Sequence, residues 1–276
     1  MTLKKIINLL RKIFPRGWTP FLKILAILIP SLRKYKILLK NGDSLHVDLS
    51  DEMSLGYFYF GGHPHEPGTA RLFKRYIKKD FVVMDVGANI GYYTKIASSL
   101  CGPKGKVLSF EPLPRAYHLL KTNTRKLENT IIHECALSDS IGNEKFYIKN
   151  AGDTSSLLKG DVSQNRESIE IEVRKGDEFI KSFKRLDFLK IDVEGYELRV
   201  LKGLQKSITK HRPLIIFEFL LSYSKAMKLE FEDFEIFFKP LDYLLKHINH
   251  NGSELFSAEP TNMIVAIPNE VRRSLD

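Results

Sequence analysis

The segments FVVMDVGANIG, at residues 81–91, and GKVLSFEP, at residues 105–112, decide the fold that this sequence predicts. Each has the pattern of a buried apolar strand that ends in a carboxylate, Asp85 in the first and Glu111 in the second. Glycines follow Asp85, and Glu111 lies 24 positions after Gly87. Open α/β sheets bind nucleosides in this way, with glycines beside the charged end of the ligand and an acid on the ribose. The two segments therefore predict a nucleoside-binding sheet.

Apolar strands alternate with helical segments along most of the chain. The strand cores are nearly continuous apolar runs, as in a sheet that helices cover on both faces. This alternation predicts an α/β fold with a Rossmann-like, doubly wound and mostly parallel sheet. A first hairpin should turn at Asn41-Gly42, and residues 51–68 read as irregular. The expected strands are residues 81–86, 106–110, 130–136, 188–193, 214–219 and 262–267, an inserted β-hairpin is expected at 145–149 and 168–173, and the helices at 92–100, 114–127, 196–208 and most of 224–245.

Positive charge is concentrated at the start of the chain. The chain has 276 residues and a formal net charge of +10. Residues 1–40 hold ten Lys and Arg side chains and no acid, so the rest of the chain is neutral on average. A nucleic-acid enzyme more often carries its basic surface around the catalytic cleft, which disfavours nucleic acid as a partner. The sequence divides into a basic amphipathic segment, residues 1–35, and a catalytic domain, residues 36–276, with its core at about 66–220.

The N-terminal segment has two interpretations. Residues 3–14 predict an amphipathic helix that ends at Pro15. The apolar run at 24–29 is far shorter than the about 20 residues of a spanning helix, and no cleavage site of a secretory signal follows it. Either residues 1–30 lie on an anionic membrane surface, or they form a helical pair that packs on the catalytic domain. The two cysteines, each within or beside an expected core element, favour reduced thiols and a cytoplasmic location. In the first interpretation the protein is peripheral at the inner face of the membrane.

The turn after the first long strand favours one cofactor class. Glycine lets the backbone approach a ligand closely, and the free N–H groups of the following helix suit a carboxylate. Asp85 can balance an ammonium group, and Glu111 can accept both ribose hydroxyls. The spacing from Gly87 to Gly91 lacks the second close glycine of the dinucleotide motif, which a sulfonium cofactor without a pyrophosphate does not need. The pattern favours S-adenosylmethionine over NAD; the alternative is a plain strand–helix turn with a solvated Glu111.

Seven pieces of the sequence follow one another between residues 65 and 220: HEPGTARLF, VMDVGANIGYYT, LSFEPLPRAYHLLKTN, ALSDSIGNEKFYI, GDTSSL, LDFLKIDVEGYELRVLKGL and PLIIFEF. Through them the chain resembles the FkbM family of S-adenosylmethionine-dependent methyltransferases, with DVGANIG and LKIDVEGYE as the specific motifs. The resemblance implies a class I methyltransferase fold and mostly O-methylation, often of sugars or natural products. The cofactor contacts that it implies are Asp85, Gly87, Asn89, Gly91 and Glu111, with Ala136, Leu137 and Ser138 near the adenine. Ser138 alternatively only caps a turn.

Three carboxylates are candidates for the acceptor side of the site. Methyl transfer to an alcohol requires alignment of donor and acceptor, and a group that removes the hydroxyl proton. Asp192 and Glu194 close the fourth strand, and they share a side if the strand persists. Glu218 lies inside an apolar run, where a carboxylate needs a partner or a use. In the structural alternatives, Glu194 caps its own helix and Glu197 is a solvated helix acid.

Three functions follow from these observations. The first is an O-methyltransferase that acts on a hydroxyl of a glycan, a lipid-linked sugar or a related metabolite. The second is an RNA or protein methyltransferase, although no amide motif for base-nitrogen chemistry is present. The third is a non-catalytic cofactor-binding or scaffold module, which the intact Asp85, Glu111 and Asp192 disfavour. His63 and His65 are further candidate bases in a loop, and no residue spacing demands a metal ion.

Overall fold

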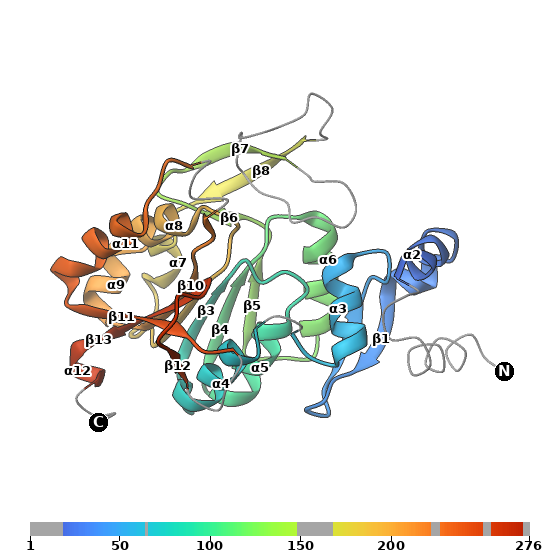
Figure 1. The fold of residues 1–276 in the computed structure, drawn as a ribbon, viewed down its shortest axis with the longest axis horizontal. Coiled ribbons are helices and arrows are strands. Elements are labelled where there is room, and N and C mark those ends of the chain that lie inside the picture. The colour runs from blue at the N-terminus through green and yellow to red at the C-terminus, as the bar shows by residue number, and fades with distance from the viewer. Residues whose placement is uncertain (1–18, 64–65, 148–167, 222–226, 251–254, 273–276) are drawn as a thin grey trace. The chain divides into compact units, whose positions relative to one another are not determined.

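The chain forms two compact units. In the computed structural model, the described residues are 19–63, 66–147, 168–221, 227–250 and 255–272 (Figure 1). Unit 1 covers Met1–His65 and Asn150–Asp153, and unit 2 covers Glu66–Lys149 and Thr154–Asp276. The helix expected at residues 3–14 and the GDTSSL piece lie outside the described residues. Within the described ranges, every helix is too short or too polar to cross a lipid bilayer.

Unit 1 contains the first hairpin. Its described elements are α2 (Thr19–Leu28), η1 (Pro30–Lys34), β1 (Tyr35–Leu38), β2 (Ser44–Val47) and α3 (Glu52–Phe60). The expected hairpin is confirmed, because β1 and β2 pair antiparallel with Tyr35 opposite Val47. Tyr35 and Ile37 are buried while Lys36 and Leu38 are exposed, which is the alternation of a half-buried strand.

Helix α3 corrects the expectation of an irregular stretch at residues 51–68. The Asp51 carboxylate accepts a hydrogen bond from the Ser54 N–H at 2.8 Å, which caps the start of the helix. Gly61, in the left-handed conformation with φ of 64°, ends it. Both capping signals are present in the sequence, but the aromatic residues between them obscure the helical pattern.

The central sheet of unit 2 has the strand order β12-β11-β13-β10-β9-β3-β4-β5. Its strands are β3 (Val82–Val86), β4 (Lys106–Phe110), β5 (Thr130–His133), β9 (Phe188–Ile191), β10 (Leu214–Glu218), β11 (Tyr243–Ile248), β12 (Phe256–Ser257) and β13 (Met263–Pro268). β5, β4, β3, β9 and β10 are parallel, and antiparallel pairings add β13, β11 and β12. The predicted Rossmann-like, doubly wound sheet is confirmed. Its order reverses between β3 and β9, the point at which such sheets bind ligands.

Helices cover both faces of this sheet. They are α4 (Pro67–Tyr76), α5 (Tyr92–Cys101), α6 (Pro114–Thr124), α7 (Asp177–Ile180), α8 (Glu197–Gly203), α9 (Gln205–His211), α11 (Phe231–Phe238), η2 (Lys239–Leu241) and α12 (Asn269–Arg272). Met84 packs in the core formed with α8, α9 and α11, whereas Val83 and Phe188 pack with α4 and α5. Side chains alternate along a strand, so Asp85 and Lys190 are directed to the face that α4 and α5 cover.

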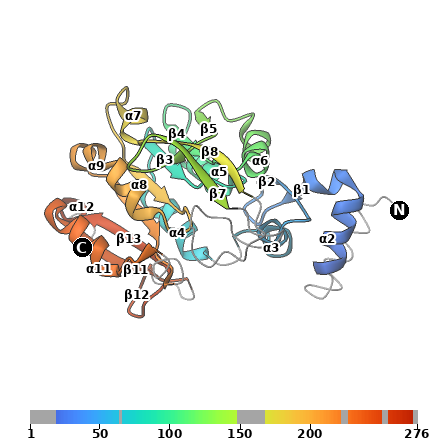
Figure 2. The same cartoon turned by 90° about the horizontal axis from the view of Figure 1, so that it is seen from above.

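A smaller sheet lies over the carboxyl ends of the central strands (Figures 1 and 2). It consists of β6 (Ala136–Leu137), β8 (Ser168–Arg174) and β7 (Gly142–Tyr147), in that order. The antiparallel pairing of β7 and β8 confirms the inserted hairpin. Gly203, the last residue of α8, lies against this sheet, because a Cβ on it would be 2.0 Å from the Ser138 backbone oxygen. Glycine therefore allows α8 to contact the end of β6 directly.

Four expected boundaries are wrong. The strand expected at 130–136 is divided between β5 and β6, because the chain leaves the central sheet and pairs with β8. The strand expected at 188–193 is shorter, because β9 ends at Ile191 and left-handed backbone follows at Glu194 and Gly195. The helix expected at 196–208 is divided into α8 and α9 at Leu204. The segment 224–245 includes the start of β11, because left-handed Asp242 redirects the chain into the sheet.

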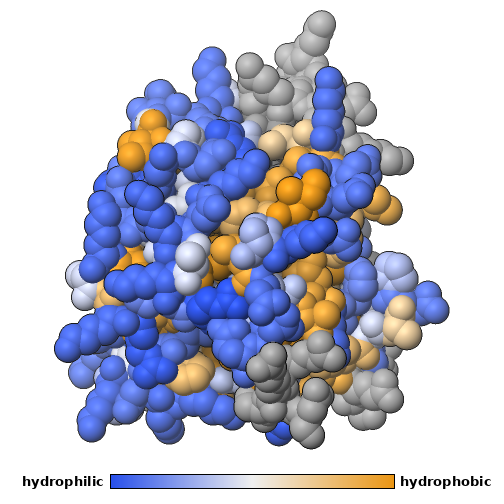
Figure 3. All heavy atoms as spheres, turned by 90° about the vertical axis from the view of Figure 1, so that its left-hand side faces the viewer, coloured by the Kyte–Doolittle hydropathy of each residue, from blue (hydrophilic) through white to orange (hydrophobic). Residues whose placement is uncertain are grey.

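The surface and the interior of unit 2 differ in polarity as expected for a globular fold. The face that bears α11 and α12 is largely hydrophilic, with a hydrophobic area near its centre (Figure 3). Ile236 is one of the large apolar side chains that are exposed. Inside, Cys101 and Cys135 are buried free thiols, as the sequence predicted.

Replacement of Gly203 tests the contact between α8 and β6. Gly203→Ala should destabilise the fold by about 1–3 kcal/mol, because the new methyl group overlaps backbone rather than a mobile side chain. Urea denaturation measures the change as a lower midpoint. Lys202→Ala, at the exposed neighbouring position, should change stability by less than about 0.5 kcal/mol. Equal midpoints for the two variants would contradict the close contact.

Candidate active site

The turn after β3 allows two strand ends to meet. Gly87 has a φ of +77°, and a Cβ on it would lie 1.8 Å from the Asp192 backbone oxygen. The Asp192 N–H donates to the Val86 carbonyl at 3.0 Å, so β3 and β9 end side by side. Asn89 and Gly91 also have positive φ values, of 49° and 89°. The close approach that the sequence predicted at these glycines is realised at Gly87 by the chain itself.

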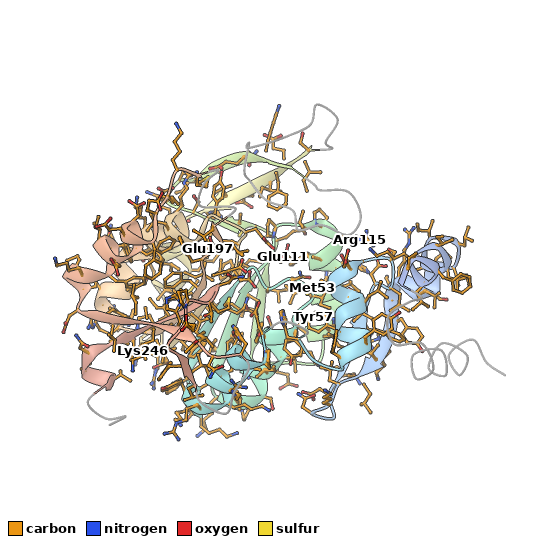
Figure 4. All side chains as sticks on the ribbon, viewed as in Figure 1. Met53, Tyr57, Glu111, Arg115, Glu197 and Lys246 are labelled. Atoms are coloured by element: carbon orange, nitrogen blue, oxygen red, sulfur yellow. The ribbon has the colours of Figure 1, made fainter. Side chains whose placement is uncertain are left out.

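Glu111 ties this turn to the end of β4. Its Oε2 accepts from the Asn89 N–H at 2.8 Å and its Oε1 from the Leu113 N–H at 3.0 Å. Burial raises the pKa of Glu111 to about 7, although the two N–H donors favour the ionised form. A carboxylate has about four acceptor positions, so Glu111 keeps capacity for further donors such as hydroxyl groups. Figure 4 shows Glu111 and Glu197 at the same end of the sheet, below β7 and β8.

Asp85 lies deep in the fold. It is fully buried, and its Oδ2 accepts from the Thr94 hydroxyl at 2.6 Å. The strand register places Asp85 beside Lys190 of β9. Burial raises the pKa of Asp85, and the charge of Lys190 opposes this effect. Its Oδ1 has no hydrogen-bond partner in the described part of the chain. The predicted contact of Asp85 with an ammonium group stays a prediction.

Lys190 is a candidate that the sequence analysis missed. Its side chain is only 2% exposed, and its Nζ lies 2.9 Å from Asp192 Oδ2 and 5.0 Å from the centroid of the Tyr93 ring. Burial lowers the pKa of Lys190, but the carboxylates of Asp192, Asp85 and Glu66 outweigh burial and raise it above its ordinary value. The ammonium group is therefore charged at neutral pH. The available signal was a lysine inside the apolar strand FLKI, because a buried charge must be paired.

Glu66 is the second candidate that the sequence analysis missed. It precedes α4 as the N-cap residue, and the Tyr93 hydroxyl donates to its Oε2 at 3.1 Å. Burial, and then the negative charge of Asp192, raise the pKa of Glu66 to about 7, while Lys190 lowers it. The only sequence signal was its position before Pro67, because proline is common at the first position of a helix.

The carboxylates predicted for the acceptor side lie in different environments. β10 and β9 pair with Phe217 beside Ile191, so Glu218 and Asp192 follow at adjacent strand ends. The Asp192 side chain is 23% exposed. Burial, and then the charges of Asp192 and Glu194, raise the pKa of Glu218 far above its ordinary value, so it is protonated at neutral pH. The condition under which Glu194 would share a side with Asp192 is not met, because β9 ends at Ile191 and Glu194 is left-handed, with φ of 57°.

Glu197 is buried, which corrects its interpretation as a solvated helix acid. Its Oε1 accepts from the Val193 N–H at 2.9 Å and its Oε2 from the Gly195 N–H at 3.0 Å. Burial raises the pKa of Glu197 to about 7, against the hydrogen bonds from these N–H groups. Glu197 therefore closes the loop between β9 and α8, next to Asp192.

The residues predicted to lie near the adenine form β6 and the position after it. Ala136 and Leu137 are buried in β6, and Ser138 is fully buried. The Ser138 hydroxyl donates to Asp139 Oδ1 at 3.1 Å, and Arg199 Nε donates to the same oxygen at 2.8 Å. These contacts fix the chain directly after β6.

The two candidate histidines belong to unit 1, whereas the residues of this cluster belong to unit 2. The His63 ring packs against the Tyr57 ring within unit 1, at a centroid distance of 5.5 Å, and His65 lies outside the described residues. No three or more His, Cys, Asp and Glu side chains of the described residues are grouped in a way that could hold a metal ion.

The raised pKa of Glu197 predicts a pH-dependent effect of Glu197→Gln. Between the unfolded value of about 4.3 and the folded value of about 7, the folded state binds a proton that the unfolded state does not, so stability falls as pH rises. The neutral Gln removes this loss, so Tm should rise by a few degrees at pH 7.5 and little at pH 5. Glu235→Gln, on the exposed side of α11, is the matched control. A lower Tm for Glu197→Gln at pH 7.5 would show that the carboxylate hydrogen bonds outweigh burial.

Comparisons with known proteins show which proteins the chain is similar to. The FkbM methyltransferase domain matches residues 85–251. Hexuronic acid methyltransferase AglP from Haloferax volcanii is 32% identical over 149 residues, which are 52% of this chain and 58% of that protein. 2-O-methyltransferase NoeI from Sinorhizobium fredii is 29% identical over 151 residues, which are 49% of this chain and 62% of that protein. The crystal structure of methyltransferase FkbM from Methylobacillus flagellatus KT aligns with a TM-score of 0.48 and 19% identity, over 90% of this chain and 60% of that chain.

The match to the curated relatives and the match to the family domain differ in the share of protein that they cover. The chain matches less than two thirds of the length of each of these two curated relatives. The domain match, in contrast, spans more than half of this chain and includes the turn after β3, Glu111, Lys190 and Asp192. The chain therefore belongs to the FkbM methyltransferase family.

Proposed function

We propose that this protein is an S-adenosylmethionine-dependent O-methyltransferase whose acceptor is a hydroxyl of a glycan, a lipid-linked sugar or a related metabolite. The observation that carries the proposal is the cluster at one edge of the sheet: the Gly87 turn, Glu111 and the ion-paired Asp192. Membership of the FkbM methyltransferase family supports methyl transfer. The names of the two relatives, one for hexuronic acid and one for 2-O-methylation, support a sugar as the acceptor.

The chemistry of the described residues fits this cofactor. Glu111 can accept the ribose hydroxyls with its remaining acceptor capacity. The first N–H groups of α5 suit the carboxylate of the methionine part, and Asp85 Oδ1, a buried acceptor without a partner among the described residues, suits a cationic group. The residues proposed around the adenine are Ala136, Leu137 and Ser138. When bound, S-adenosylmethionine supplies a methyl group on a positively charged sulfur.

The acceptor side is proposed at the adjoining strand ends. Asp192 is partly exposed, and its ion pair with the buried Lys190 fixes its orientation, so it can accept a hydrogen bond from the acceptor. Glu218 is protonated and can donate one. Glu194 lies on the loop that Glu197 closes and is the third residue proposed to contact the acceptor. Alignment of the acceptor oxygen is the main contribution that these groups can make to the transfer.

Two substitutions test the proposed halves of the site. Glu111→Ala should weaken S-adenosylmethionine binding by about 1–3 kcal/mol, measured by isothermal titration calorimetry, because the ribose hydroxyls lose their acceptor. Asp192→Asn should keep cofactor affinity and lower turnover, and it should also lower Tm, because the buried Lys190 ammonium loses one of its carboxylate partners. Turnover is measured by mass spectrometry as the gain of a methyl group on a panel of glycans and lipid-linked sugars.

The same assay distinguishes the alternatives. Glu235→Ala, on the exposed side of α11, should match the unsubstituted protein in both measurements. Unchanged affinity of Glu111→Ala would remove Glu111 from the cofactor site. Methyl transfer to RNA or protein in place of the panel would support the second function. Binding without transfer to any of these acceptors would support a non-catalytic module.

We also propose peripheral contact of the N-terminal part with the anionic inner face of the cytoplasmic membrane. On α2, Phe21, Ile24 and Leu28 follow a helical stripe and are exposed, Ile24 to 55% and Leu28 to 71%. Exposed Arg33 and Lys34 follow this helix. An apolar helix face next to basic side chains is typical of a helix that lies on an anionic surface. The alternative is that other residues of the chain cover this face.

Vesicle co-sedimentation tests the membrane contact. The full-length protein should bind vesicles that contain phosphatidylglycerol but not phosphatidylcholine alone, and salt should weaken binding, because each basic residue contributes about 1 kcal/mol of screened attraction. Ile24→Asp with Leu28→Asp should abolish binding without loss of fold, since both side chains are exposed. Deletion of residues 1–30 should also abolish binding to the vesicles. Protein that stays in the supernatant under all conditions would contradict the contact.

A further inference from the structure

We propose that Glu66 accepts the proton of the hydroxyl that becomes methylated, and that Tyr93 and Lys190 are the residues that position it. This inference rests on the proposed O-methyl transfer and adds the identity of the base. The geometry that carries it is a chain of contacts from α4 through α5 to β9. These contacts connect Glu66, which precedes the central sheet in the sequence, to the edge of the sheet at which we propose the acceptor.

The contacts place Glu66 at the acceptor side. α4 and α5 cover the face of the sheet to which Lys190 is directed, and Glu66 immediately precedes α4. The Tyr93 hydroxyl donates both to the Glu66 backbone oxygen at 3.2 Å and to its Oε2 at 3.1 Å. The Lys190 ammonium lies over the ring of the same tyrosine and binds Asp192. Three segments that are distant in the sequence thus converge on one place.

The other carboxylates of the cluster are less suited to accept a proton. Both oxygens of Glu111 and of Glu197 accept backbone N–H groups. Asp85 is fully buried and bonded to Thr94, and Asp192 binds the ammonium of Lys190. Glu218 is protonated at neutral pH. Each of these groups is therefore committed to a structural contact or lacks the charge that a base needs.

Glu66 differs from them in its contacts. Its side chain is partly exposed, and a neutral group, the Tyr93 hydroxyl, donates to its Oε2 at 3.1 Å. Burial, and then the charge of Asp192, raise its pKa to about 7. A base works best when its pKa lies near the operating pH, because it is then both ionised and sufficiently basic.

The step is balanced within the proposed reaction. The hydroxyl proton passes to a Glu66 carboxylate oxygen, and the acceptor oxygen forms the new bond to the methyl carbon. The carbon–sulfur bond breaks with its electron pair on sulfur, which gives a methyl ether and S-adenosylhomocysteine. The neutral Glu66 then returns its proton to water.

Glu66→Gln tests this role, with the first acceptor that the unsubstituted protein methylates in the panel as the probe. The neutral isostere should lower kcat about 100- to 10,000-fold, the usual contribution of a general base. The unsubstituted protein should gain activity as pH rises through about 7, because Glu66 must be ionised to accept the proton. The residual activity of the variant should not show this rise with pH. The affinity for S-adenosylhomocysteine should stay within about twofold. Glu235→Gln should retain the kcat and the pH profile of the unsubstituted protein.

A second measurement does not depend on transfer. In protein labelled with ¹³C at the glutamate carboxyl groups, the NMR signal that disappears in Glu66→Gln should titrate near pH 7. It should titrate at higher pH in Tyr93→Phe, which removes a donor to the ionised form.

Three results would overturn the role of Glu66: retained kcat in Glu66→Gln, a carboxyl signal that titrates below pH 5, or a large loss of S-adenosylhomocysteine affinity, which would place Glu66 on the cofactor. If the unsubstituted protein methylates no hydroxyl of the panel, the proposed function itself fails. Transfer that survives Glu66→Gln contradicts only the assignment of the base.

Discussion

The buried ammonium group of Lys190 is the interaction on which the rest of the site depends. An unpaired charge at such a position would cost roughly several kcal/mol, so Lys190 requires negative partners. Asp85 lies beside it on β3, Asp192 follows it on β9, and Glu66 adds charge from the start of α4. Because these partners belong to different elements, the pairing of one ammonium group joins the ends of two strands and a helix.

The alternation of side chains along the strands makes this convergence possible. Val83 and Phe188 pack under α4 and α5, so the residues two positions later, Asp85 and Lys190, are directed to the same face. At the carboxyl ends of the strands, where the apolar layer stops, this face becomes polar. The alternation of side chains that forms the apolar core therefore also places the charged groups next to the turn that is expected to bind the cofactor. In an open α/β sheet this edge is also the general position of ligands.

Two buried carboxylates hold loops at this edge of the sheet in the same way. Glu111 accepts the N–H groups of Asn89 and Leu113, and Glu197 accepts those of its own loop. Both are buried, and burial raises the pKa of each to about 7. Such groups oppose folding at neutral pH relative to a neutral side chain, a cost that natural proteins accept mostly at functional sites. Glu111 and Glu197 both lie at the proposed site, where a fixed conformation of the loops is more important for function than the highest stability of the fold.

The sequence by itself determined the order of strands and helices, the hairpins and the strand ends at Asp85 and Glu111, because periodicity and turn residues act over short distances. It also indicated Asp192 and Glu218, since a carboxylate after or within an apolar strand needs a polar partner or a functional role. It did not indicate α3 or β11, whose patterns were obscured by aromatic residues and by a left-handed turn.

Only the tertiary structure decided which charges meet. Glu66, Tyr93 and Lys190 come from three separate segments, and nothing in their spacing links them. It also decided that β9 ends before Asp192 and that Glu197 is buried, since both follow from contacts of the backbone with Gly87 and with the loop before α8. Local patterns fix the elements, whereas the pairing of buried charges depends on where the sheet order places them.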